Sequence, residues 1–154
     1  MEAPEASLFD NLLPVGGPLV GLDLVEVDRF ERALARHPGL VERLFTPDEI
    51  AYCRGRGRPA LHFAARFAAK EAVGKLLGSG VLSWKEIAVT DGSSVGAGGR
   101  PVVTLSGGTA RVARERGVAA VRVSLSHVDS LAGACAVAVA CSGEGADDGR
   151  SRGA

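Results

Sequence analysis

Continuous and alternating runs of apolar residues predict five short strands along this chain. The first run, residues 20–27, reads Val-Gly-Leu-Asp-Leu-Val-Glu-Val and has a carboxylate, Asp23, in its middle. Residues 121–126 alternate between apolar and polar side chains, which is the period of a half-buried strand. A glycine-rich stretch predicts a hairpin connection between two of the other candidates. These other strand candidates are residues 87–90, 102–105 and 134–140.

The longest helix is predicted over residues 60–77, where alanines are frequent, and it stops at Gly78. With a step of about 100° per residue, small or apolar side chains recur on one face of this helix. A stripe of such small side chains can lie close against a sheet or another helix. Charged residues occupy both flanks of the stripe. The residues of the stripe are Ala65, Ala69, Ala72 and Leu76.

Three shorter helices are expected from their start signals and composition. Asp28 is an N-cap candidate for a helix directly after the first strand. Thr46 is followed by proline and has Glu49 three positions later, which is the pattern of a capping box. Residues 109–116 have helical composition and close at a glycine. Because helices and strands alternate without a regular βαβ order, we expect an α+β fold with an antiparallel sheet packed against the long helix.

The chain is expected to hold one folded domain, residues 19–141. Its 154 residues and hydrophobic content of 46% suit a single buried core. Residues 1–18 contain three prolines and two adjacent glycines and are expected to form a flexible N-terminal extension. Residues 142–154 are mostly Gly, Asp, Ser and Arg, with little to bury, and are expected to form a disordered tail.

Charge and cysteine content argue against several classes of protein. Lys plus Arg equal Asp plus Glu, 18 of each, so net charge gives no sign of nucleic-acid binding. No apolar run reaches the roughly 18–20 residues that cross a bilayer, and residues 1–18 lack the basic start of a secretory signal. The cysteines 53, 135 and 141 have no metal-ligand spacing. We therefore expect a cytoplasmic protein that binds neither nucleic acid nor membrane.

The strongest candidates for chemistry are two carboxylates. Asp23 lies within an apolar strand, where an ionised carboxylate needs a partner, hydrogen bonds or a metal. Glu71 and Lys75 are one turn apart on one flank of the long helix, with Arg66 and Lys70 on the opposite flank. Glu71 and Lys75 could form an ordinary surface ion pair. Alternatively, Asp23 and Glu71 converge on a cation, with the basic residues beside a phosphorylated substrate.

Three blocks of sequence resemble a known family. They are residues 21–29 (GLDLVEVDR), 66–75 (RFAAKEAVGK) and 124–127 (SLSH). In their order and spacing they resemble the signature blocks of the holo-[acyl-carrier-protein] synthases, which are 4′-phosphopantetheinyl transferases of the small, single-domain type. The resemblance spans about residues 19–141. The chain departs from the family pattern in its N-terminal extension, its glycine-rich connection and its C-terminal tail.

The resemblance implies Mg²⁺-dependent transfer of 4′-phosphopantetheine from coenzyme A to a serine of an apo acyl carrier protein of the fatty-acid or polyketide type, with release of 3′,5′-ADP. It makes Asp23 and Glu71 the metal ligands, and Asp23, Glu71 and Lys75 the catalytic residues. Two carboxylates suffice because Mg²⁺ keeps water and takes phosphate oxygens. Glu71, acting through a metal-bound water, is the first choice of general base and Lys75 the second, and the sequence leaves both open.

The remaining family positions imply a binding site for coenzyme A. Arg66, Lys70 and Lys75 would contact its phosphates. His127, at the end of an alternating strand, would bind nucleotide phosphate or ribose, although a lone histidine is more often structural. Pro101 matches a family turn near the nucleotide, and it could equally be a simple turn residue.

The resemblance also implies partners. Arg29, Arg32 and Arg36 form a basic edge on the helix after the first strand, which is either a solvated face or a surface for an acidic carrier protein; the resemblance favours Arg29 and Arg36 as carrier contacts. Small members of the family form homotrimers with coenzyme A between adjacent subunits. The rival hypothesis is a non-catalytic module that binds coenzyme A or carrier protein and has kept the fold.

Overall fold

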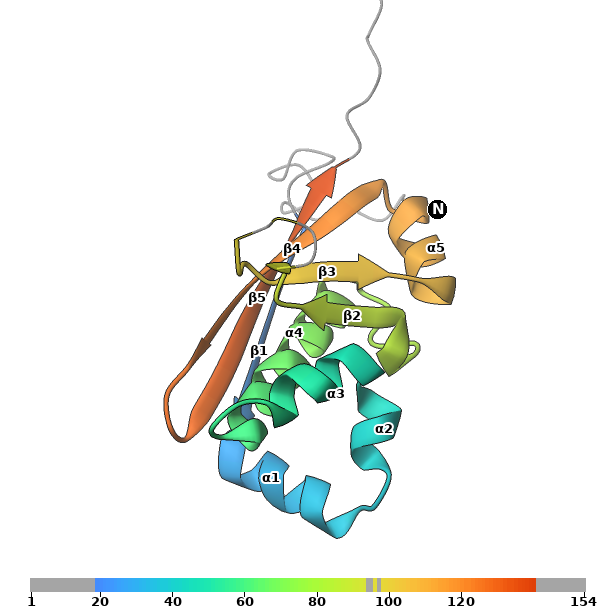
Figure 1. Cartoon of the computed structure of the whole chain (residues 1–154). Helices are drawn as coiled ribbons and strands as arrows, with labels where there is room; N and C mark the ends of the chain where they lie inside the picture. The colour runs from blue at the N-terminus through green and yellow to red at the C-terminus, as the bar shows by residue number, and fades with distance from the viewer. Residues whose placement is uncertain (1–18, 94–95, 97, 141–154) are drawn as a thin grey trace, which may run out of the picture.

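A five-stranded antiparallel sheet forms one layer of the structure, with the strands in the order β1-β5-β4-β3-β2 (Figure 1). The structure is a computed structural model that describes residues 19–93, 96 and 98–140. All five predicted strands are present, and β4 and β5 extend beyond their predicted bounds as a long hairpin. The strands are β1 (Val20–Glu26), β2 (Ile87–Thr90), β3 (Val102–Leu105), β4 (Val118–His127) and β5 (Leu131–Ala140).

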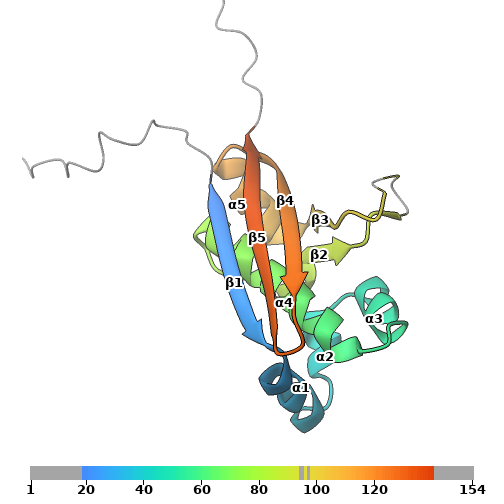
Figure 2. The ribbon, with the colours of Figure 1, turned by 90° about the vertical axis from the view of Figure 1, so that its left-hand side faces the viewer.

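Helices pack on one face and at one end of this sheet, which confirms the expected α+β class (Figures 1 and 2). The four helices predicted from sequence are present. Two single-turn elements, α2 and η1, were not predicted because one turn is too short to show a hydrophobic period. The helical elements are α1 (Val27–Arg36), α2 (Leu40–Leu44), α3 (Pro47–Arg54), α4 (Pro59–Leu77), the 3₁₀ turn η1 (Trp84–Glu86) and α5 (Gly107–Glu115).

The helix starts show one confirmed and one wrong prediction. The capping box of α3 is formed, since the Thr46 hydroxyl accepts from the Glu49 amide and the Glu49 carboxylate accepts from the Thr46 amide. The expectation that Asp28 caps α1 is wrong. This helix begins at Val27, directly after β1, so Asp28 already lies in its first turn and Glu26 occupies the N-cap position.

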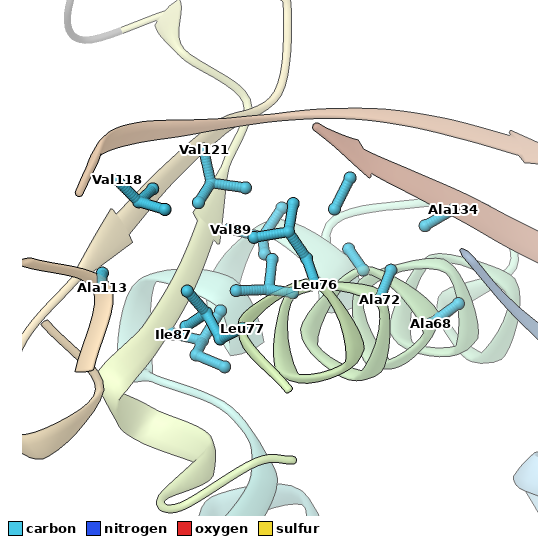
Figure 3. Packing of buried hydrophobic residues seen from close by; sticks show 13 residues of the cluster. Ala68, Ala72, Leu76, Leu77, Ile87, Val89, Ala113, Val118, Val121 and Ala134 are labelled. Carbon is cyan, nitrogen blue, oxygen red and sulfur yellow. The ribbon is translucent and has the colours of Figure 1, made fainter. Parts of the chain in front are cut away.

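The predicted alanine stripe of α4 lies against the sheet at short range. Ala65, Ala69, Ala72 and Leu76 are all buried, and Figure 3 shows the α4 side chains meeting those of the strands. Gly21 of β1 is packed so tightly on this helix that a Cβ there would overlap the carbonyl oxygen of Ala72. Small residues on both elements therefore allow β1 and α4 to approach closely enough for their polar side chains to meet.

Aromatic side chains attach α1 and η1 to the outer part of α4. The Phe30 and Phe67 ring centroids are 4.9 Å apart, and Phe67 stacks on Trp84 at the same distance. Val27 and Phe30 are buried while the arginines of α1 are exposed. This packing fixes α1 beside the end of β1, with its basic edge toward solvent.

The other face of β1, β5 and β4 has no covering helix among the described residues, and Figure 2 looks onto it. Leu22 and Leu24 of β1 are each 60% exposed there. On β5, Val137 and Val139 are also exposed. We call this surface, made by these four residues and Val20, the outer sheet face. A continuous apolar patch of this kind is typical of a surface that binds another protein.

Three expectations remain: the two terminal segments and the absence of a membrane-spanning helix. The predicted N-terminal extension, residues 1–18, and tail, residues 142–154, lie outside the described residues, so their boundaries stay predictions. Within the described part of the chain, no helix combines the length and the apolar character that a membrane crossing requires.

Candidate functional site

Asp23 and Lys75 meet where β1 crosses α4. The Lys75 ammonium donates to Asp23 Oδ1 at 2.8 Å and to the Leu22 carbonyl oxygen at 3.1 Å. The Asp23 side chain is 16% exposed, whereas that of Lys75 is 54% exposed. The hydrogen bond and charge of Asp23 raise the pKa of Lys75 above its usual value. The buried carboxylate predicted from the strand pattern thus has a cationic partner, and that partner comes from α4.

Glu71 lies one turn before Lys75 and faces the same carboxylate. Partial burial raises the pKa of Glu71, the nearby charge of Asp23 raises it further, and Lys75 opposes the shift. Asp23 and Glu71 also line the same cleft, so the two carboxylates lie on one side of the molecule. The simple surface pair between Glu71 and Lys75 is not formed, since Lys75 reaches across to β1 instead.

Asp23 and Glu71 line a cleft of about 460 Å³ that also includes Arg29 and Phe30 of α1. Within the described residues, no cluster of three or more His, Cys, Asp or Glu side chains has metal-ligand geometry. A divalent cation here would be held by these two carboxylates. Two hard oxygen donors, mutually repelling and open to a cleft, match the needs of Mg²⁺, which retains several waters.

A second and larger cleft lies on the other side of α4. It has a volume of about 1100 Å³ and is lined by Arg66, His127 and Pro101 among the predicted site residues. Arg66 donates from Nε to the Val89 carbonyl oxygen at 3.1 Å, and its guanidinium lies 3.8 Å from the Tyr52 ring centroid. Three of the five predicted coenzyme A contacts are therefore gathered in one basic cleft.

Histidine and tyrosine rings extend this cleft. The His62 and His127 rings meet edge to face at 5.9 Å, and Tyr52 approaches His62 at 6.1 Å. Burial lowers the pKa of His62, and the charges of Arg66 and His127 lower it further. His62 and Tyr52 were missed from the sequence. The spacing of His62 and Arg66, four residues apart on α4, could have placed His62 on this flank, but no sequence signal points to Tyr52.

The structure corrects the expected role of Lys70. Its side chain is fully buried, and its ammonium donates to Glu49 Oε2, the Leu44 carbonyl and the Trp84 carbonyl at 2.8–2.9 Å. All three N–H groups are thus used inside the protein. The prediction that Lys70 contacts a coenzyme A phosphate is wrong, because the flank of α4 that carries it packs against α3 and η1.

The two clefts belong to different sides of one subunit. Asp23 pairs in register with Ala134 of β5, whereas His127 lies on β4, beyond β5. Two strand spacings, about 10 Å, separate β1 from β4, and α4 contacts both of these strands. The residues lining the two clefts do not overlap. One chain therefore presents a carboxylate half-site, with Asp23, Glu71 and Lys75, and a basic half-site, with Arg66 and His127.

The basic edge of α1 lies beside the carboxylate half-site. Arg29 lines the same cleft as Asp23 and Glu71. Arg32 and Arg36 are exposed further along the helix. A negatively charged partner could therefore contact α1 while one of its groups enters the cleft.

Comparisons with known proteins agree with this geometry. Residues 19–132 match the family described as the 4′-phosphopantetheinyl transferase superfamily. The holo-[acyl-carrier-protein] synthase of Moorella thermoacetica is 49% identical over 119 residues, which cover 76% of this chain and 90% of that protein. The synthase of Desulforudis audaxviator is 48% identical over 123 residues, 78% of this chain and 91% of that protein. A solved structure of the Helicobacter pylori holo-[acyl-carrier-protein] synthase in complex with coenzyme A has a TM-score of 0.66 at 27% identity, covering 78% of this chain and 99% of that one.

Proposed function

This chain belongs to the 4′-phosphopantetheinyl transferase superfamily, and from that premise we propose that it transfers 4′-phosphopantetheine from coenzyme A to a serine of an apo acyl carrier protein. The serine oxygen forms a bond to the phosphorus next to pantetheine. The bond from that phosphorus to the bridging oxygen breaks, and 3′,5′-ADP leaves with the electron pair. The observation that carries the proposal is the convergence of Asp23, Glu71 and Lys75 in a chain with these relatives.

Asp23 and Glu71 are the proposed ligands of Mg²⁺. Both carboxylates line one cleft, and the charge of Asp23 adds to burial in raising the pKa of Glu71, which supports a cation between them. When bound, the ion would supply charge neutralisation and alignment to the pyrophosphate of coenzyme A. Lys75 is the cation that holds Asp23 when the carboxylate has no other partner.

Glu71 is the proposed general base that takes the proton of the carrier serine. Burial and then the charge of Asp23 raise its pKa above the usual value while no cation lies between the two carboxylates. Asp23 stabilises the charged form of Lys75 and raises its pKa. A lysine acts as a base only when it is neutral, so this shift disfavours Lys75 as the base. These directions favour Glu71 over Lys75, whose proposed role is to neutralise phosphate charge.

The basic half-site is proposed to bind the nucleotide part of coenzyme A. His127 supplies a donor for phosphate or ribose oxygens, and Pro101 lines the same cleft. Arg66 also lines it, but its side chain is largely buried and its Nε donates to the Val89 carbonyl. Solved structures of relatives in complex with coenzyme A support binding of this molecule by the chain. Lys70 is excluded from the binding site by its burial.

A homotrimer is the proposed assembly, with each site shared between adjacent copies. The two half-sites line separate clefts within one chain, so a second copy could bring a basic half-site opposite a carboxylate half-site. The exposed leucines and valines of the outer sheet face support contact with further copies. A closed cyclic assembly would bury this surface on every subunit.

Arg29 and Arg36 are the proposed contacts for the carrier protein, because Arg29 lines the carboxylate half-site and Arg36 is exposed further along the same helix. The carrier is proposed to be of the fatty-acid or polyketide type. A cytoplasmic location is also proposed. It is supported by the free thiols of Cys53 and Cys135, since a reducing compartment keeps cysteines unpaired.

Intact-protein mass spectrometry of an apo acyl carrier protein tests the proposed function. The carrier is incubated with this protein, coenzyme A and Mg²⁺, beside a sample containing EDTA. We expect a gain of one phosphopantetheine group that EDTA abolishes. Coenzyme A binding without any gain on fatty-acid and polyketide carriers would favour the non-catalytic module, and a gain that persists in EDTA would contradict the role of the metal.

A further inference from the structure

Glu49 and Lys70 form a fully buried ion pair that links five elements of the fold. Both side chains are without solvent exposure, and Glu49 Oε2 lies 2.8 Å from the Lys70 ammonium. Lys70 also donates to the carbonyl oxygens of Leu44 in α2 and Trp84 in η1. Glu49 accepts in addition from the amides of Thr46 and Val89. No buried side-chain polar atom in the described residues lacks a partner, so this network is complete.

The network holds the free edge of the sheet against α4. β2 is an edge strand, and the backbone of Val89 would otherwise lack a partner there. The Val89 amide donates to Glu49 Oε1 at 2.8 Å, and the Val89 carbonyl accepts from Arg66 Nε at 3.1 Å. Side chains from α3 and α4 thus take the place of a neighbouring strand. Arg66 and Lys70 come from the same flank of α4, one turn apart.

The face of α4 that meets β1 and β5 carries mainly small side chains, such as Ala65, Ala69 and Ala72. Helices are held in a particular orientation by large side chains that fit between those of the neighbour. An alanine face opposite Gly21 allows close approach but sets rotation and sliding only weakly. Large buried side chains elsewhere on α4, such as Phe63 and Leu77, and the polar contacts on its flanks therefore fix its orientation together.

We propose that the buried pair of Glu49 and Lys70 positions α4 so that Glu71 faces Asp23. Lys70 directly precedes Glu71, so the two side chains are set about 100° apart around the helix. Holding Lys70 on the α3 and η1 side directs Glu71 toward the β1 side. Glu49 and Lys70 are positioning residues, since neither reaches the cleft. The expected effect on phosphopantetheine transfer rests on the proposed function. The expected effect on the positions of Glu71 and Asp23 does not.

This role fits the known energetics of buried charge. A buried ion pair adds little to stability compared with an apolar pair, because desolvation opposes the attraction. In some proteins such pairs instead specify one arrangement of the elements around them. Burial indeed lowers the pKa of Lys70 despite the opposing effect of Glu49. Replacing both residues by neutral ones should therefore preserve folding better than replacing Lys70 alone, which would leave Glu49 as an unpaired buried charge.

The test compares the double variant Glu49→Gln/Lys70→Met with wild type and with a matched control, Glu42→Gln/Arg54→Met. The control removes an ion pair of 3.5 Å whose side chains are mostly exposed. Two quantities are measured on folded protein: the positions of the Glu71 and Asp23 side chains, from a crystal structure of each protein, and kcat for transfer from coenzyme A to a carrier protein. Circular dichroism and thermal melting establish the folded fraction of each sample.

We expect the double variant to fold, the Glu71 side chain to turn away from Asp23, and kcat to drop about 10- to 100-fold, because small displacements of catalytic groups have effects of this size. The control should match wild type in both. An unchanged position of Glu71 with wild-type kcat in the double variant would overturn the proposal and leave the pair a purely structural role. If wild type itself transfers nothing, the proposed function fails, and the position of Glu71 still decides the positioning role. If the double variant does not fold, Glu49→Gln alone is measured by the same two readouts.

Discussion

Lys75 of α4 reaches across to Asp23 of β1, and the two charged groups lie 2.8 Å apart. The contact joins the long helix to the edge strand at the point where Glu71 also faces Asp23. It explains how an apolar strand accommodates a carboxylate. Since Lys75 is more than half exposed, the pair can open, and Asp23 would then be free to bind another cation.

The pKa of Glu71 should respond to Asp23 in a defined direction. The Asp23→Asn change removes a nearby negative charge, so the pKa of Glu71 should fall relative to wild type. The Lys75→Met change removes a positive charge, so the pKa of Glu71 should rise. Both are measured by titrating the side-chain carboxyl carbon. Glu86, whose pKa is lowered by hydrogen bonds from Thr109 and Gly108, serves as an internal control that neither change should move. Equal Glu71 values in all three proteins would show that the carboxylates do not converge.

The dependence of transfer on pH should follow the same group. Glu71 acts as a base only when ionised, so the relevant pKa is the one that it has in the presence of Mg²⁺, which would favour the ionised carboxylate. The rate should therefore fall on the acid side as the pH drops through the measured pKa of Glu71, and it should be constant just above it. A rate profile whose acid limb does not coincide with the titration of Glu71 would point to another base.

Close packing at Gly21 should make this position intolerant of a side chain. In Gly21→Ala the new Cβ would overlap the carbonyl oxygen of Ala72, forcing β1 away from α4. We expect a loss of about 3 kcal/mol in the free energy of unfolding, at the upper end for overpacking. Gly57→Ala is the control, because no described atom lies within 4 Å of a Cβ there, and its change should stay within about 0.5 kcal/mol. Urea unfolding of both variants measures the difference; equal stability would contradict the close approach.

The outer sheet face should mediate self-association. Leu22 is 60% exposed in one subunit, and Leu22→Lys would place a charge in the proposed interface, where desolvation disfavours it. Sedimentation equilibrium should give a trimer for wild type and a smaller species for the variant. Leu82→Lys is a matched control, since Leu82 is 53% exposed but lies outside the sheet. Trimers that persist in Leu22→Lys would place the interface elsewhere.

The basic edge of α1 should affect carrier binding more than chemistry. In Arg36→Ala, loss of one exposed charge should raise KM for the carrier several-fold, on the order of 10-fold at low salt, with kcat retained. The difference should shrink as salt rises, because exposed charges are screened. Arg111→Ala removes another exposed arginine, from α5, and should leave KM unchanged. A fall in kcat without a change in KM would assign Arg36 a different role.

Much of this fold could be predicted from the sequence because its signals are local. The alternation in β4, the capping box at Thr46 and the glycine stop of α4 each depend on a few neighbouring residues. The strand-centred Asp23 correctly indicated that a partner would be found nearby. These inferences needed only strand periodicity and the cost of burying a charge.

The wrong predictions concern which flank of α4 is covered and where α1 begins. Lys70 was expected at a phosphate, because helix spacing alone cannot tell which flank of an alanine-rich helix is covered by α3 and η1. Asp28 was expected as a cap, but β1 continues directly into α1 and leaves no residue between them. The rings of Tyr52 and His62 meet through tertiary packing that no local pattern contains.

Complementation between two inactive variants tests the shared site most directly. Asp23→Asn damages the carboxylate half-site and His127→Ala the basic half-site, so each protein alone should fail to transfer phosphopantetheine. Equal amounts of the two variants are dissociated and reassociated together to form mixed trimers. If a site takes one half from each of two adjacent copies, a quarter of the random junctions pair two intact halves. The mixed trimers should then regain about a quarter of wild-type activity. Activity that stays at the level of the separate variants, in trimers shown to be mixed, would contradict a site built between subunits.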